Sequence, residues 1–113
     1  KPAIFYNKPI KDPHTALGWI YWIAFLEHAL AEASRNTEAA PDSPDRYADR
    51  ACVHAELGQY EEAIADLTTC IELSPHDPAY FRRRAQFYLA LGRDADAAAE
   101  EKAAAEIETE SAQ

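Results

Sequence analysis

The chain has 113 residues, enough for one small domain, and its net charge of −9 and sequence pI near 4.8 make it acidic. An acidic surface repels phosphate, which excludes non-specific nucleic-acid binding and disfavours anionic membrane surfaces. Apolar residues make up 48% of the chain, charged residues make up 27%, and glycine occurs only three times. This composition is that of a globular protein and favours an all-α fold.

Residues 1–12 are interpreted as an extended N-terminal arm, which Lys1, Lys8 and Lys11 make basic. The segment 1–15 contains no apolar stretch of the kind found in a signal peptide. The cytoplasm or the interior of an organelle is therefore the expected compartment. The chain starts at Lys1 rather than at a methionine, so a processed protein and a fragment both stay open.

Residues 13–43 are predicted to form one long aromatic helix and a linker, with the helix running from about His14 to Asn36. Apolar residues recur along it at steps of three and four, in two stripes. The first stripe contains Trp19, Trp22, Ile23, Leu26, Leu30 and Ala33, and the second contains Leu17, Ile20, Tyr21, Ala24 and Phe25. A helix that is apolar nearly all round is buried on more than one side. We expect one stripe to pack on the following helix as a pseudo-repeat.

The second stripe has no obvious cover in so small a domain. The arm around Phe5, a homodimer partner or a larger complex could each supply one. Tryptophan is favoured in binding hot spots, so we expect an apolar docking face built from Trp19, Trp22 and Phe25. The apolar run from Leu17 to Leu26 is shorter than the roughly 20 residues that cross a bilayer. No membrane span is predicted, although peripheral membrane association through tryptophan and tyrosine stays open.

The remainder of the chain repeats itself, beginning at Pro44 and again at Pro78, and we call the interval between these two prolines the repeat length. Eight positions are identical in the two units, and they are Pro44/Pro78, Arg50/Arg84, Ala51/Ala85, Leu57/Leu91, Gly58/Gly92, Ala63/Ala97, Ala65/Ala99 and Glu72/Glu106. Each unit is predicted to be a helix, a turn at Leu-Gly and a second helix. The glycine follows the first helix, where the backbone becomes left-handed.

Helix boundaries are marked by proline. Pro75 ends the first unit because proline cannot continue a helix, and Pro44 and Pro78 stand at helix starts behind Ser43 and Asp77. Small alanines in each unit would let its two helices cross closely. The sequence therefore predicts helical hairpins stacked side by side.

The chain resembles the tetratricopeptide repeat family over about residues 44–108. The resemblance rests on the turn Leu57-Gly58-Gln59-Tyr60-Glu61-Glu62-Ala63-Ile64 and on the repeat ending Cys70-Ile71-Glu72-Leu73-Ser74-Pro75. It implies an α-solenoid of two helical hairpins. The second unit departs from the family pattern at Asp94, as expected where a stack ends in water. Residues 109–113 are predicted to be a disordered tail.

The same resemblance implies a concave groove that holds a peptide or helix of a protein partner. The groove residues it implies are Cys52 and Glu56 in the first unit and Arg82, Arg83 and Gln86 in the second, with Asp45, Ala48, Ala55, Ala79, Leu89 and Ala90 beside them. Intramolecular pairing of the arginines with Asp45, Asp49 or Asp77 is the alternative. Some family members grip a C-terminal carboxylate, and of the matching positions here only Arg83 suits that role.

No residue pattern points to catalysis. No two of the four histidines stand three or four residues apart, the two cysteines are not clustered, and no phosphate-binding loop is present. We expect neither a metal nor a cofactor and no enzyme activity. The function predicted is a protein-protein interaction module. The alternative is a fixed accessory subunit of a larger complex, possibly at a membrane, anchored by the aromatic helix.

Overall fold

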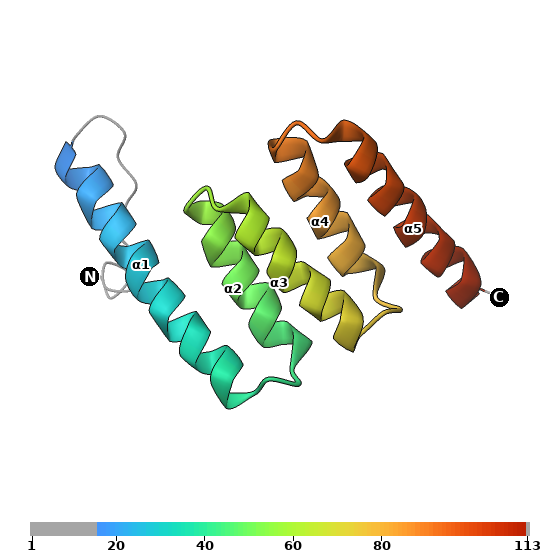
Figure 1. Ribbon diagram of the computed structural model, residues 1–113, viewed down its shortest axis with the longest axis horizontal. Helices are drawn as coiled ribbons and strands as arrows, with labels where there is room; N and C mark the ends of the chain where they lie inside the picture. Colours follow the sequence, from blue (N-terminus) through green and yellow to red (C-terminus); the bar gives the residue numbers. More distant parts are fainter. Residues whose placement is uncertain (1–15, 113) are drawn as a thin grey trace, which may run out of the picture.

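The computed structural model describes residues 16–112, which form helices connected by short turns (Figure 1). In chain order the helices are α1 (Ala16–Ala39), α2 (Pro44–Glu56), α3 (Tyr60–Leu73), α4 (Pro78–Ala90) and α5 (Asp94–Ala112). The prediction of an all-α fold with one long helix before two hairpins is confirmed. The arm predicted at residues 1–12 lies outside the described residues.

Both hairpins turn at the predicted glycines. Gly58 and Gly92 have φ angles of 78° and 76°, values that side chains larger than hydrogen rarely allow. The backbone N–H of Gln59 donates to the carbonyl of His54 over 2.8 Å, and the N–H of Arg93 donates to the carbonyl of Tyr88 over the same distance. The two turns therefore close their helices in the same way, as a repeat should.

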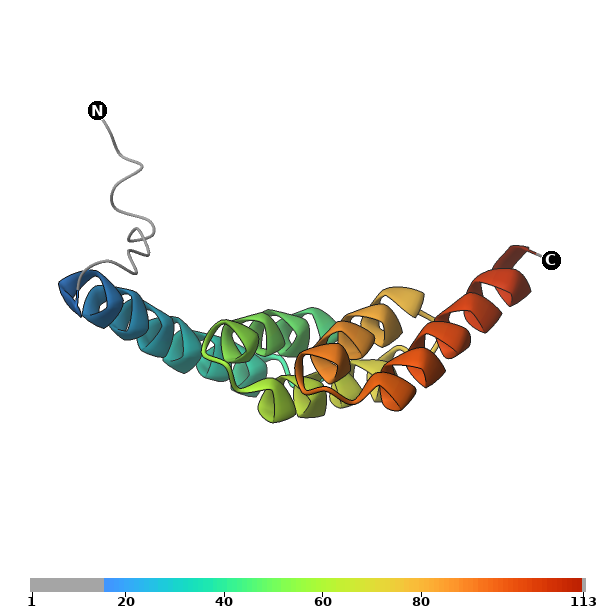
Figure 2. The same ribbon diagram turned by 90° about the horizontal axis from the view of Figure 1, so that it is seen from above.

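Consecutive helices pack on one another and form a shallow arc. Figure 2 shows α2 and α4 on the inner side of this arc and α3 on its outer side. The centre of the stack is a small core whose fully buried members are Ala51, Ala63, Leu67 and Cys70. Because Ala51 and Ala63 are fully buried where the two helices meet, the helices of the first hairpin can approach closely.

Helix α1 ends at Ala39, three residues beyond the expected Asn36. The hydroxyl of Thr37 donates to the carbonyl of Ser34 over 2.7 Å, which satisfies a polar side chain inside the last turns. Trp22, Leu26 and Ala33 are buried as the first stripe predicts. Two other members of that stripe are not, since Trp19 and Ile23 are 37% and 38% exposed.

Helix α5 continues to Ala112, so the tail predicted to be disordered from residue 109 is helical as far as the structure describes it. The Thr109 hydroxyl donates to the carbonyl of Ala105 over 2.9 Å. Arg82 of α4 donates to both carboxylate oxygens of Glu108, over 2.6 and 2.7 Å. This contact with α4 holds the last turns of α5 in place. The polar composition of residues 109–113 had suggested disorder, because composition does not show such a contact between helices.

Candidate functional site

A groove of about 540 Å³ lies between α2 and α4 on the inner side of the arc. Its lining residues are Ser43, Asp45, Arg46, Ala48, Asp49, Ala79, Tyr80 and Arg83. Charges of both signs therefore surround small apolar side chains. The Tyr80 hydroxyl donates to Asp45 over 3.5 Å, and burial raises the pKa of Tyr80, so this hydroxyl stays a donor at neutral pH.

The five expected groove residues are divided between two smaller hollows. Arg82, Arg83 and Gln86 line one of about 360 Å³ that extends toward Glu108 of α5. Cys52 and Glu56 line another of about 330 Å³ between α1 and α2. Arg83 joins the two sets, since its Nη1 donates to the Sγ of Cys52 over 3.0 Å. Of the five, only Arg83 also lines the groove between α2 and α4.

The three consecutive arginines of α4 have different partners. Arg82 pairs with Glu108 over 2.6 Å and with Glu101 over 3.5 Å, and Arg84 pairs with Glu100 over 2.8 Å. Within residues 16–112, Arg83 has no carboxylate at ion-pair distance. Intramolecular pairing, the alternative interpretation, therefore holds for Arg82 and Arg84, but their partners are acids of α5 rather than Asp45, Asp49 or Asp77.

A polar contact that we call the arginine clasp occurs once in each hairpin. In the first, Arg50 donates to the two carboxylate oxygens of Asp66 over 2.9 and 2.8 Å, and to the hydroxyl of Thr37 over 3.2 Å. Arg50 of α2 thus ties α1 to α3. Bidentate pairs of this kind are the stronger type of ion pair.

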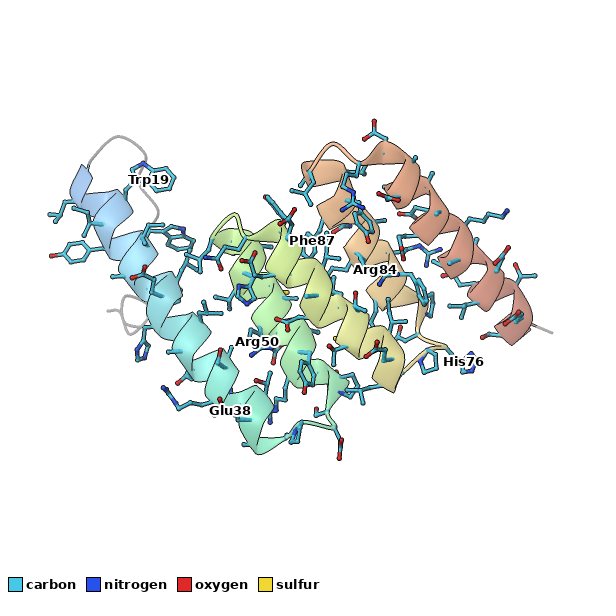
Figure 3. All side chains as sticks on the ribbon, in the orientation of Figure 1. Trp19, Glu38, Arg50, His76, Arg84 and Phe87 are labelled. Carbon is cyan, nitrogen blue, oxygen red and sulfur yellow. The ribbon has the colours of Figure 1, made fainter. Side chains whose placement is uncertain are left out.

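In the second clasp, Arg84 donates to Glu100 over 2.9 and 2.8 Å and to the hydroxyl of Thr68 over 3.0 Å. Figure 3 shows Arg50 and Arg84 at corresponding places on α2 and α4. The identity of the two arginines follows from the repeat, but the acids that they bind were not predicted. The available signal was that Asp66 and Glu100 also stand one repeat length apart.

His54 and Cys70 make contacts inside the first hairpin. The Nδ1 of His54 lies 2.7 Å from Oε1 of Gln59, and its Nε2 lies 3.8 Å from Asp66. Cys70 is fully buried, its Sγ donates to the carbonyl of Pro44 over 3.2 Å, and burial raises the pKa of its thiol to about 12. Both cysteines are free, and among residues 16–112 no three His, Cys, Asp or Glu side chains gather to hold a metal ion.

The three residues expected to share an apolar docking face do not form one surface. Trp22 is only 5% exposed and stacks on Phe25 with ring centroids 5.8 Å apart, whereas Trp19 lines a separate depression with Ile20 and Ile23. That depression measures about 390 Å³. The large apolar side chains most exposed on α1 are instead Leu17, Ile20 and Tyr21, at 59%, 61% and 59%. No helix in the described part of the chain is long and apolar enough to cross a membrane.

Comparison with known families extends the repeat pattern beyond the segment that the sequence analysis assigned to it. A family model described as tetratricopeptide repeat matches residues 25–100. The chain belongs to the tetratricopeptide repeat family. The match begins inside α1, well before Pro44, so the last part of α1 belongs to the repeat pattern. The tetratricopeptide repeat fold is a scaffold for protein-protein interactions.

Solved structures of MamA share the fold. The MSR-1 MamA superposes with a TM-score of 0.72 and 22% sequence identity, over 84% of this chain and 54% of MamA. A second MamA crystal structure gives a TM-score of 0.73 and 21% identity, over 80% of this chain and 53% of that one. The chain thus spans about half the length of MamA. No curated protein matches the sequence.

Proposed function

We propose that the protein is an interaction module that holds a peptide or helix of a partner protein in the groove between α2 and α4. The observation that carries this proposal is the state of Arg83. Its two neighbours are neutralised by carboxylates of α5, while Arg83 lines the groove and, within residues 16–112, donates its one side-chain hydrogen bond to the Cys52 thiol. A guanidinium in this position can bind a carboxylate of the partner in bidentate fashion.

The other walls of the groove define the chemistry of that partner. Arg46 adds a second cation, and Asp45 and Asp49 supply anions on the α2 side. Ala48 and Ala79 leave room for a backbone or a small side chain between the charges. We therefore expect a segment that carries an acidic residue opposite Arg83 and a basic residue opposite Asp49. The protein binds this segment without altering it chemically.

Peptide selection tests the proposal. A display library of mixed-charge peptides is selected on the wild-type protein, and the selected peptides are then measured on Arg83→Glu. We expect binding to fall at least about fivefold, since a carboxylate would meet a like charge. Arg35→Glu, at an exposed position of α1, is the matched control and should bind as the wild type does. Equal binding by Arg83→Glu, or no selected peptide, contradicts the proposal.

The exposed apolar side chains of α1 favour a second candidate, a fixed accessory subunit of a larger complex. Leu17, Ile20 and Tyr21 are each about 60% exposed on one helix, and clustered exposed apolar side chains are typical of interaction surfaces. Light scattering on a sizing column distinguishes the candidates. Dimers or concentration-dependent aggregates support the subunit, and a monodisperse monomer at high concentration contradicts it.

A further inference from the structure

Helix α1 carries the register of the repeat on a face that no other helix of residues 16–112 covers as the first helix of a hairpin. Glu32 stands one repeat length before Asp66, and Asp66 stands one repeat length before Glu100, so the acid of the arginine clasp is present in all three outer helices. Ala29, Ala63 and Ala97 follow the same spacing. Together with the family match from residue 25, this register makes α1 the second helix of a repeat.

In the two complete repeats this face packs on the first helix of the same hairpin. Ala63 and Ala97 are 0% and 3% exposed, and Asp66 and Glu100 each receive the arginine of that helix. On α1 the corresponding Ala29 is only partly buried and Glu32 is exposed. Within the described residues Glu32 has no ion pair, because α1 packs against α2 and no hairpin helix lies on its other side.

The chain does not supply the missing arginine at the expected register. The position one repeat length before Arg50 is Ala16, which is part of α1 itself. Instead, α1 extends N-terminally and adds apolar side chains along the same face. Phe25 and Tyr21 stand seven and eleven positions before Glu32 and therefore lie on its side of the helix, with Leu17 one turn further. Tyr21 and Leu17 are each 59% exposed.

The first helices of the two complete repeats, α2 and α4, show which kind of helix packs on the second helix of a repeat. Each is 13 residues long and contains an aromatic residue, two variable residues, arginine and alanine, as in Tyr47 to Ala51 and Phe81 to Ala85. The guanidinium of Arg50 lies 5.8 Å from the Tyr47 ring, and that of Arg84 lies 5.8 Å from the Phe81 ring. In both repeats the arginine that binds the acid of the second helix therefore also lies over the aromatic ring of its own helix.

We propose that the open-repeat face of α1, which consists of Leu17, Tyr21, Phe25, Ala29 and Glu32, binds an amphipathic helix of a partner protein. That helix carries the aromatic-x-x-Arg-Ala pattern, its arginine pairs with Glu32, and it takes the place of the first helix of the incomplete repeat. The site borders the hollow between α1 and α2, which Phe25 and Ala29 also line, and it shares no lining residue with the groove between α2 and α4. It therefore does not depend on the proposed role of Arg83.

The test uses a peptide of known pattern as the probe. A fluorescent peptide with the sequence of residues 43–58 is titrated with the whole protein, and binding is followed by anisotropy. We expect saturable binding that weakens about fivefold on Glu32→Arg. A peptide carrying Arg50→Glu should bind poorly to the wild type and recover on Glu32→Arg. The control Glu27→Arg, on the side of α1 with Trp19, should not change the affinity.

Other results overturn the proposal. Absence of saturable binding at millimolar peptide would do so, as would equal binding by Glu32→Arg, which is expected if the peptide displaces the resident α2. A dimeric wild type that Tyr21→Ser converts to a monomer would make a second copy the occupant. Tyr21→Ser also serves as a second variant, since it should weaken binding of the peptide without altering the helical circular dichroism of the protein. Arg83→Glu should leave peptide affinity unchanged, which keeps this test apart from that of the groove.

Discussion

The two end helices of the stack, α1 and α5, both correspond to the second helix of a repeat. Their outer faces differ in character, because that of α5 is polar and that of α1 is apolar. Helix α3 has Tyr60, Ile64 and Leu67 on the side that faces the next hairpin. At the corresponding positions α5 has Asp94, Ala98 and Glu101, and all three are exposed. The α1 end carries exposed Leu17 and Tyr21 instead. A polar outer face is stable in contact with water, whereas an exposed apolar face is typical of a surface that binds another helix or protein.

The polar contacts of the two ends differ in the same direction. At the position of Thr68, whose hydroxyl accepts a hydrogen bond from Arg84, α5 has Lys102. An arginine of a further repeat would there meet a like charge. Glu32 at the other end would instead attract one. The described outer face of α5 thus lacks the residue types that bind a further repeat, whereas that of α1 has them.

The largest expected effect separates the two sides of α1. Trp22→Ala should lower the free energy of unfolding by about 3–5 kcal/mol, because it removes a large buried side chain. Tyr21→Ala, next to it but 59% exposed, should change stability by less than about 0.5 kcal/mol. Urea denaturation of both variants measures the difference. Similar losses would show that the exposed side of α1 is packed in solution.

The arginine clasps give the next effect. Asp66→Ala should cost about 3 kcal/mol, because it leaves Arg50 without its acid between α1 and α3. Glu100→Ala should cost about 2 kcal/mol, since it releases only the terminal helix α5 from Arg84. Urea denaturation gives the losses, and hydrogen exchange should show faster exchange confined to α5 in Glu100→Ala. Uniform exchange in that variant would contradict the comparison.

A substitution on the outer face of α5 tests whether polarity closes that end. Glu101→Leu restores the residue type of Leu67 at the corresponding position. The expected loss of stability is at most about 1 kcal/mol, because Glu101 is exposed and its 3.5 Å ion pair with Arg82 lies in solvent. Self-association in sedimentation should increase relative to the wild type. An unchanged sedimentation profile at all concentrations would show that something other than polarity ends the stack.

The smallest effect concerns the end of α5 and depends on pH. The hydrogen bond from Arg82 holds the pKa of Glu108 below its ordinary value. Since the folded pKa is lowered, the contribution of the pair is complete above the ordinary carboxylate pKa and is lost as the pH falls through the lowered one. An NMR titration should show the Glu108 pKa rise in Arg82→Gln. Unchanged titration would mean that the pair does not form in solution.

Much of the fold could be read from local patterns. The left-handed turns at Gly58 and Gly92, the proline at helix starts and the constant repeat length each act within a short stretch of backbone. Their outcome does not depend on distant packing. Asp66 and Glu100 also stand one repeat length apart. Their role was not predicted, because an acidic residue on a helix is usually exposed to solvent and the sequence does not show which arginine it meets.

The candidate site could not be predicted without the tertiary structure. Helical periodicity says which residues share a side of a helix, but it does not say what covers that side. The sequence by itself determined that α1 has apolar stripes, that α4 has three arginines and that the chain ends in an acidic segment. Only the packing of α4 on α5 decided that Arg82 and Arg84 are neutralised while Arg83 stays available. Ion pairs between helices depend on crossing geometry, and residues distant in sequence meet only when the stack is complete.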